Sequence, residues 1–206
     1  MNQQAQMDKQ PELIANNRKW AASQEDNTPG IFHKSATGQS PEYLWIGCSD
    51  SRVPPCRITG SEPGQIFVHR NVANIVLEDD ANLQAALQYS VEALKVPNIV
   101  VCGHYRCGGV QAALNGCPYE SVNKWVRPIS KLAREQAGEL FKLSETARID
   151  RLCELNVLAQ TDRLAESAVV RSAWANGQPL QLHSWIYQLD NGQLKVLREP
   201  LSGAST

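Results

Sequence analysis

The segment 43–52 reads YLWIGCSDSR, and its first half is an unbroken apolar run. Such a run is typical of a parallel strand that is buried on both faces. Cys48 and Asp50 follow directly, so polar side chains stand where this strand ends. A second apolar run, 99–102, leads into GHYRCGG at 103–109. The sequence therefore predicts two clusters of chemically active side chains at the carboxyl ends of two neighbouring strands.

The rest of the chain alternates between strand and helix patterns. The strand at 180–189 leads through Asn191-Gly192, a hairpin signal, into 194–197. Further strands are expected at 65–70, and helices at 11–23, 82–95, 108–114, 121–138 and 145–176; loops are expected at 27–41 and 54–64. This order predicts an α/β fold, with a central, mostly parallel β-sheet flanked by α-helices and a C-terminal antiparallel hairpin.

Composition limits the function classes. With 206 residues and 42% hydrophobic content, the chain is expected to form a single domain over 1–206, with 1–10 as a flexible arm. The net charge of −1 leaves no basic excess for nucleic acid or a membrane surface. The polar N-terminus lacks a signal-peptide core, so a cytoplasmic location is expected.

Six cysteines are present in a chain for which an intracellular location is expected, which favours metal binding or buried thiols over disulfides. Cys102 and Cys153 lie in apolar segments and are expected in the core. The sequence assigns no role to Cys56 and Cys117.

Cys48, His104 and Cys107 are expected to bind one metal ion. Cysteine and histidine are zinc ligands, and three protein ligands with one open position are typical of a catalytic zinc site. Water or Asp50 would take the fourth position. The alternative is a closed Cys-His-Cys-Asp site that only pins two strands. Arg52 favours the catalytic interpretation, because a bidentate bond to Asp50 would keep that carboxylate off the metal.

At these residues the chain resembles the β-class carbonic anhydrases, from about Leu13 to Tyr187. The similarity is carried by three blocks in order, 43–54 (YLWIGCSDSRVP), 67–74 (FVHRNVAN) and 102–109 (CGHYRCGG). The resemblance implies one Zn²⁺ per subunit, bound by Cys48, His104 and Cys107, and a catalytic Asp50–Arg52 dyad that orients the zinc-activated water. The implied reaction is the reversible hydration of CO2 to bicarbonate and a proton.

The resemblance also implies a substrate pocket and an assembly. Gln39, Phe67, Tyr89 and Gly108 match positions that line the CO2 pocket. An apolar pocket with one amide donor suits a small nonpolar substrate that gains negative charge on oxygen. The family forms homodimers or homotetramers with the active site at the subunit interface.

Trp45, Arg70 and Tyr187 match a non-catalytic bicarbonate site found in some members of the family. Their joint presence suggests the allosteric subtype, in which Asp50 leaves Arg52 and binds zinc at low pH or high bicarbonate. The alternative is that Trp45 is a core residue and Arg70 a solvated strand end.

Two other functions stay open. The first is a related zinc hydrolase that acts on carbonyl sulfide or carbon disulfide. The second is a non-catalytic structural zinc or redox module. A proton shuttle is not identified, and His33, His69 and His183 are candidates by residue type alone.

Overall fold

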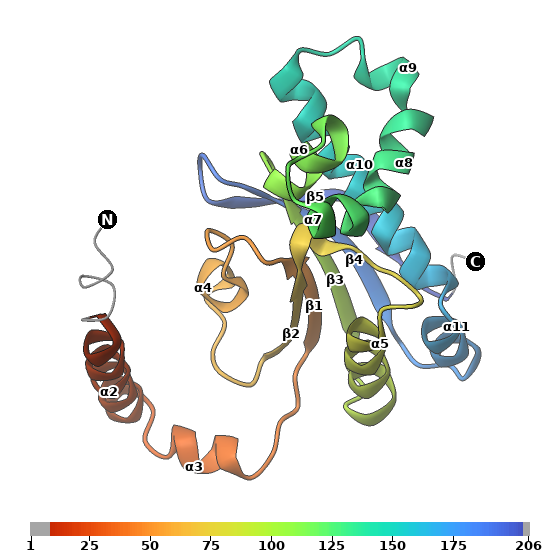
Figure 1. The fold of residues 1–206 in the computed structure, drawn as a ribbon. Coiled ribbons are helices and arrows are strands. Elements are labelled where there is room, and N and C mark those ends of the chain that lie inside the picture. The colour runs from red at the N-terminus through yellow and green to blue at the C-terminus, as the bar shows by residue number, and fades with distance from the viewer. Residues whose placement is uncertain (1–8, 204–206) are drawn as a thin grey trace. The chain divides into compact units, whose positions relative to one another are not determined.

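The computed structural model describes residues 9–203 (Figure 1). The chain divides into two compact units, Met1–Gln39 and Ser40–Thr206. Their positions relative to one another are not determined. The single domain over 1–206 stays a prediction, and most of the expected arm at 1–10 lies outside the described residues.

Within its described residues, the N-terminal unit contains the helices α2 (Lys9–Asn27) and α3 (Ile31–Ala36). The expectation of a loop over 27–41 was wrong at α3. Gly30 precedes α3 with φ 80° and lets the chain turn between the two helices. The rings of Trp20 and Phe32 lie edge to face with centroids 5.8 Å apart, and this contact holds α3 against α2.

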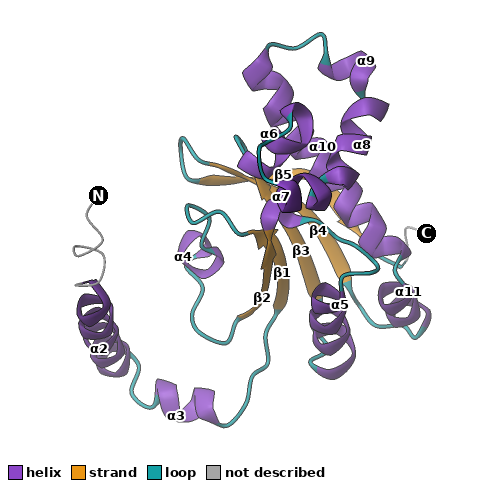
Figure 2. Ribbon diagram, viewed as in Figure 1, coloured by secondary structure: helices purple, strands orange, loops and turns teal. Residues whose placement is uncertain are grey.

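The second unit is built on a five-stranded sheet (Figure 2). Its strands are β1 (Tyr43–Cys48), β2 (Ile66–Asn71), β3 (Asn98–His104), β4 (Gln181–Gln188) and β5 (Gln193–Leu201). The order is β2-β1-β3-β4-β5, and only β5 runs antiparallel to its neighbour. The predicted fold class, a mostly parallel sheet with a C-terminal hairpin, is confirmed.

One face of the sheet packs against helices α5 (Ala81–Gln88), α10 (Glu145–Glu166) and α11 (Ala168–Ala175), with a π-helical turn, η2 (Tyr89–Ala93), continuing α5. Apolar side chains of the strands pack here against leucine and valine side chains of the helices. The fully buried residues of this core include Leu44, Ile46, Ile99, Val101, Leu83, Leu87, Val157 and Leu164. Burying each such side chain stabilises the fold by about 1.5–3 kcal/mol.

The opposite face carries a smaller cluster around Trp45, Val100 and Cys102. Ile58 of α4 (Pro55–Thr59) packs against this cluster. The expectation of a loop over 54–64 was therefore wrong at α4. Pro55 occupies the first turn of α4, where its missing N–H costs nothing, so the proline that suggested a loop starts a helix.

A group of short helices lies at the carboxyl end of the sheet, beside the 3₁₀ turn η1 (Val72–Asn74) that follows β2. It contains α6 (Gly108–Asn115), α7 (Glu120–Trp125), α8 (Arg127–Glu135) and α9 (Ala137–Leu140). The single helix expected at 121–138 is thus three short ones. Val126 and Gln136 leave helical geometry at the two breaks, and Pro128 starts the first turn of α8.

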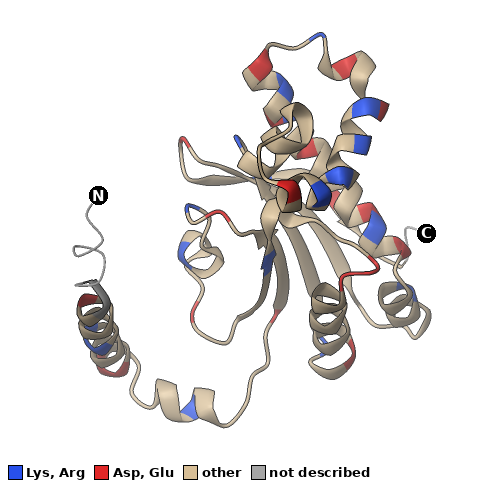
Figure 3. Cartoon of the chain, in the orientation of Figure 1, with Lys and Arg blue, Asp and Glu red and all other residues tan. Residues whose placement is uncertain are grey.

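Charges of both signs mix along α8, α9 and α10 (Figure 3). Within residues 9–203 no helix is both long and apolar enough to cross a bilayer.

Candidate metal centre

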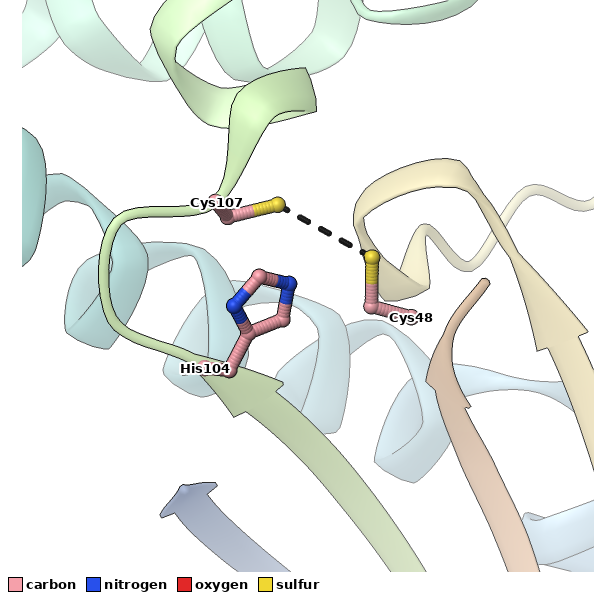
Figure 4. A group of neighbouring side chains, drawn as sticks. All are labelled: Cys48, His104 and Cys107. Atoms are coloured by element: carbon pink, nitrogen blue, oxygen red, sulfur yellow. Dashed lines mark hydrogen bonds between the residues drawn. The ribbon is translucent and has the colours of Figure 1, made fainter. Parts of the chain in front are cut away.

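Three buried side chains meet where β1 and β3 end. The thiols of Cys48 and Cys107 and the imidazole of His104 offer donor atoms that all lie within 4.8 Å of one another. Figure 4 shows these side chains converging from the end of β1, the end of β3 and the loop before α6. The two sulfur atoms are 3.9 Å apart.

The fold explains why residues 59 positions apart come together. The central strands β1 and β3 pair in parallel with Gly47 opposite Cys102, so the next residues leave the sheet at the same edge. Arg106 then takes a left-handed conformation with φ 54°, which turns the chain so that Cys107 faces Cys48. Gly109 allows α6 to approach η1, because a Cβ there would lie 2.8 Å from Val72 Cγ1.

The donor set fits zinc. The peptide oxygen of Tyr105 can only accept a hydrogen bond, so the 2.9 Å contact makes Nδ1 of His104 the donor and leaves the Nε2 lone pair free. That Nε2 atom is buried and has no hydrogen-bond partner among the described residues. Two sulfur donors and one unpartnered imidazole nitrogen are the ligand types of a catalytic zinc site.

Electrostatics prepare a thiolate at this place. The hydrogen bond from Cys107 and, to a smaller extent, the interactions with His104 and the backbone of Asp50 lower the pKa of the Cys48 thiol to about 4, against the opposing effect of burial. Holding the shared proton raises the pKa of Cys107. Burial is the largest single effect and would lower the pKa of His104, but the contacts with Cys48, the peptide oxygen of Tyr105 and Asp50 together raise it. The peptide N–H of Ala73 also donates to Cys48 Sγ at 3.4 Å.

Asp50 and Arg52 lie beside the three donors. Asp50 Oδ1 accepts hydrogen bonds from the backbone and Nε of Arg52, both at 2.9 Å, and Oδ2 accepts from Nη2 at 2.7 Å. Oδ2 also lies 3.6 Å from Nε2 of His104. These bonds from Arg52 hold the pKa of the Asp50 carboxyl well below its usual range. In the structure, the carboxylate of Asp50 is therefore hydrogen-bonded to the guanidinium group of Arg52.

The predicted pocket residues fall in different places. Phe67 of β2 and Tyr89 of η2 lie together, with ring centroids 5.9 Å apart. Gly108 opens α6, directly after Cys107. Gln39 belongs to the N-terminal unit, whose position relative to the sheet is not determined.

Trp45, Arg70 and Tyr187 come from three different strands of the sheet. Tyr187 packs against the cluster that contains Trp45. Nε1 of Trp45 is buried and has no hydrogen-bond partner within residues 9–203. Arg70 donates to the backbone oxygens of Cys48 and Asp50 at 2.8 and 2.6 Å.

Sequence reasoning missed the groups that support the donors. Asp150 and Glu154 of α10 bind the loop between His104 and Cys107. Neither acid belongs to a recognisable motif, although their spacing of four places both on one face of a helix. The Ala73 N–H leaves no trace in residue type, because every residue except proline carries this donor.

A mostly parallel sheet with a buried Cys-His-Cys cluster at its carboxyl edge is the arrangement expected of a zinc-dependent α/β enzyme. A family model described as carbonic anhydrase matches residues 43–194. A carbonic anhydrase of Emericella nidulans is 44% identical over 93% of this chain and 84% of its own length. One of Saccharomyces cerevisiae is 32% identical over 90% of this chain and 87% of its own.

Solved structures agree with these relatives. A Coccomyxa β-carbonic anhydrase in complex with acetazolamide superposes with a TM-score of 0.91, 40% identity, and coverage of 93% of this chain and 87% of the other. A structure from a report on two tetrameric β-carbonic anhydrases of Sordaria macrospora superposes with a TM-score of 0.90 and 37% identity, over 95% of this chain and 100% of the other. The chain belongs to the β-class carbonic anhydrase family, and zinc is its cofactor.

Proposed function

We propose that this lyase hydrates CO2 reversibly to bicarbonate and a proton, with Asp50 and Arg52 as its catalytic dyad. The observation that supports the dyad best is the carboxylate of Asp50, fixed by Arg52 and 3.6 Å from Nε2 of His104. Cys48, His104 and Cys107 would hold the zinc ion. When bound, zinc supplies a Lewis acid that makes water nucleophilic near neutral pH.

Asp50 orients the attacking water. Arg52 occupies Oδ1 twice and Oδ2 once, so Oδ2 keeps a lone pair that accepts a hydrogen bond from that water. The lowered pKa keeps Asp50 ionised and therefore always an acceptor. This orientation by Asp50 matters because the negative charges of two thiolates offset the 2+ charge of the zinc ion. A zinc ion held in this way would lower the pKa of its water less than one held by three neutral imidazoles.

Phe67, Tyr89, Gly108 and Gln39 are our candidates for the CO2 pocket. The contact between Phe67 and Tyr89 supports an apolar wall. Phe67 pairs with Leu44 in the sheet, so these two side chains face the same side. Cys48 lies four residues after Leu44 on β1 and therefore faces that side too. Gln39 would add the amide donor that stabilises charge developing on oxygen.

The substitution Asp50→Asn tests the dyad. Stopped-flow CO2 hydration should fall at least about a hundredfold, because the amide is a poorer proton acceptor, while zinc content stays near one per chain. Asp162→Asn is the matched control. Asp162 also pairs with an arginine, Arg198, at 2.6 Å, but it lies on α10 and not beside the three metal donors. The rate of this variant should equal that of the parent enzyme.

Other results would exclude the proposal. A zinc-loaded parent enzyme that hydrolyses carbonyl sulfide or carbon disulfide but does not hydrate CO2 would make the chain a related hydrolase. Full zinc content with no turnover of any of these substrates would make it a structural or redox module. Full CO2 turnover in Asp50→Asn would remove Asp50 from the mechanism.

We also propose that bicarbonate and low pH inhibit the enzyme through Trp45, Arg70 and Tyr187. The unpartnered Nε1 of Trp45 is a donor that lacks an acceptor. Arg70 ties down the backbone of Cys48 and Asp50, so an anion that draws Arg70 away would loosen the segment carrying Asp50. Asp50 would then leave Arg52.

Trp45→Phe removes the indole N–H, together with one ring of the buried side chain, and tests this regulation. At fixed pH, inhibition by added bicarbonate should weaken at least about tenfold in Trp45→Phe, while the rate without bicarbonate stays unchanged. Equal bicarbonate inhibition in both proteins would exclude the regulatory site and leave the catalytic proposal intact.

We propose further that the chain works as a homodimer or homotetramer with the active site at the subunit interface. The tetrameric relatives of Sordaria macrospora support this assembly. Within one described chain β2 is an edge strand, and Val68 on it is 42% exposed.

A further inference from the structure

We propose that helix α10 clamps the loop between His104 and Cys107, with Asp150 and Glu154 as positioning residues for the zinc ligands. The proposal rests on the zinc site described above. Tyr105 and Arg106 are the only residues between the two ligands, and each one is held by a different carboxylate of α10. We call residues 104–107 the ligand loop.

The first contact, between Arg106 and Asp150, stabilises a residue with a strained backbone conformation. Arg106 has φ 54°, a left-handed conformation that costs a residue with a side chain about 1 kcal/mol or more. Its backbone N–H donates to Oδ1 of Asp150 at 2.9 Å. A hydrogen bond from an N–H to a carboxylate is stronger than one between neutral groups. Asp150 therefore stabilises the turn that brings Cys107 into contact with Cys48.

The second contact holds Tyr105. Its hydroxyl donates to Oε1 of Glu154 at 2.6 Å, while its backbone N–H donates to the oxygen of Tyr187 in β4. The peptide oxygen of Tyr105 accepts the Nδ1 proton of His104. Anchoring Tyr105 at both ends therefore fixes the acceptor that sets the tautomer and the ring orientation of His104.

Glu154 is itself held in place. Lys195 of β5 donates to Oε1 at 2.9 Å, and Arg151 donates to Oε2 at 2.9 Å. The Glu154 side chain is 16% exposed. Burial would raise the pKa of Glu154, but the hydrogen bonds from Tyr105, Lys195 and Arg151 together lower it, so the carboxylate that accepts from Tyr105 is favoured.

The helix is also well placed to act as a clamp. Asp150, Glu154 and Val157 recur at intervals of four and three, which places them along one face of α10. Gly103 precedes the ligand loop, and a Cβ there would lie 2.6 Å from Cγ2 of Val157. The helix and β3 are thus in close contact next to the loop. Partners that orient metal ligands typically change metal affinity or activity by 10–100-fold when they are removed.

The zinc dissociation rate of the loaded enzyme tests this clamp. Zinc transfer to an excess of a chromogenic chelator should accelerate about tenfold or more in Asp150→Ala and in Glu154→Ala. Asp150→Asn and Glu154→Gln keep an oxygen acceptor and should lie close to the parent rate. Asp162→Ala is the matched control, because Asp162 lies on the same helix and pairs with Arg198 at 2.6 Å, with no bond to the ligand loop among the described residues.

A double-mutant cycle tests the route through Tyr105. Tyr105→Phe removes only the hydroxyl, so its zinc release should match that of Glu154→Ala, and the double variant should be no faster than either single variant. The same series loaded with Co²⁺ should show altered visible absorption bands, which report the geometry of the ligands. Tyr105→Phe is mild enough to keep the fold if an alanine variant does not.

The results separate the clamp from the zinc site itself. A parent enzyme that fails to retain zinc would overturn the proposed function. A parent that retains zinc while Asp150→Ala, Glu154→Ala and Tyr105→Phe release it at the parent rate would overturn only the clamp. Equal acceleration in Asp162→Ala would also overturn it, because the effect would then reflect a general loosening of α10.

Discussion

Gly47 lies in the middle of the signature segment, and the structure gives a packing reason for the missing side chain. A Cβ at Gly47 would overlap Nε1 of Trp45. Trp45 is 1% exposed and packs edge to face on Trp185, with ring centroids 6.2 Å apart. The indole therefore lies across the strand at a position that only glycine leaves open.

The substitution Gly47→Ala should lower the free energy of unfolding by about 1–3 kcal/mol, because the methyl group forces the buried indole from its place. Urea unfolding of the loaded enzyme measures the change. Gly138→Ala is the control, since nothing lies within 4 Å of a Cβ there, and α9 should gain up to about 1 kcal/mol from the better helix former. Equal stability of Gly47→Ala and the parent would contradict the packing argument.

His183 predicts a pH dependence of stability. Burial lowers the pKa of His183, whose Nε2 bonds Oδ1 of Asn98 at 2.9 Å. Between the lowered folded pKa and the unfolded value of about 6.5, the unfolded chain binds more protons. The contribution of His183 is therefore complete above about pH 6.5 and is lost as the pH falls through the folded pKa.

The substitution His183→Gln should flatten the decline in unfolding free energy below pH 6.5, and should cost about 1 kcal/mol at pH 7.5 through the altered bond to Asn98. Urea titrations at several pH values measure both effects. His33→Gln, at an exposed position on α3, should leave the curve unchanged. An unaltered slope in His183→Gln would show that other groups cause the decline.

At the scale of elements, a capping serine explains why the helix expected over 145–176 is two helices. Ser167 has an extended backbone conformation. Its hydroxyl accepts a hydrogen bond from the N–H of Val170 and donates one to the backbone oxygen of Leu164 at 2.7 Å. Ser167 thus ends α10 and starts α11. The two helices then cover different parts of one sheet face, which a continuous helix would not do.

Removing this cap with Ser167→Ala should cost about 1 kcal/mol of unfolding free energy, because the N–H of Val170 loses its acceptor and the oxygen of Leu164 keeps only the donor from the Ser167 backbone. Ser144→Ala is a close control, since Ser144 precedes α10 without a side-chain capping bond and should change stability by less than about 0.5 kcal/mol. Thermal unfolding of the three proteins in parallel decides the comparison. Similar losses in both variants would contradict a specific cap at Ser167.

The strands were predictable and the helix breaks were not, for a physical reason. An apolar run such as 43–47 must be buried whatever surrounds it, so burial alone identifies β1. The breaks at Val126 and Gln136 depend on how α7, α8 and α9 pack on α6 and α10, and these residue types are common inside helices. The same contrast holds in the site. The residue types at 48, 104 and 107 indicate a metal site from the sequence alone. The supporting acids Asp150 and Glu154 can be identified only from the structure, where α10 packs against the ligand loop.

At the scale of the whole molecule, the described chain leaves apolar side chains uncovered along one edge of the sheet. Val68 on the edge strand β2 is 42% exposed, Val72 in η1 is 40% exposed, and Tyr89, which contacts Phe67 of β2, is 50% exposed. Val68 and Phe67 are neighbours on β2 and point to opposite faces of the sheet, so the uncovered side chains flank this edge on both faces. Apolar side chains exposed along an unpaired strand edge are typical of association surfaces.

The substitution Val68→Lys should break the proposed assembly, because Val68 would be buried between subunits there and a charge at that position would be costly to desolvate. Sedimentation velocity over a dilution series should show dissociation at protein concentrations at least about tenfold higher than for the parent. Because the active site is proposed to lie at the interface, CO2 hydration should fall with the loss of dimers, while each chain keeps its zinc. Val196→Lys is the matched control, since Val196 is 59% exposed on β5, the opposite edge strand. Dissociation in Val196→Lys but not in Val68→Lys would move the contact to the β5 edge, and a monomeric parent enzyme with full activity would exclude an interfacial active site altogether.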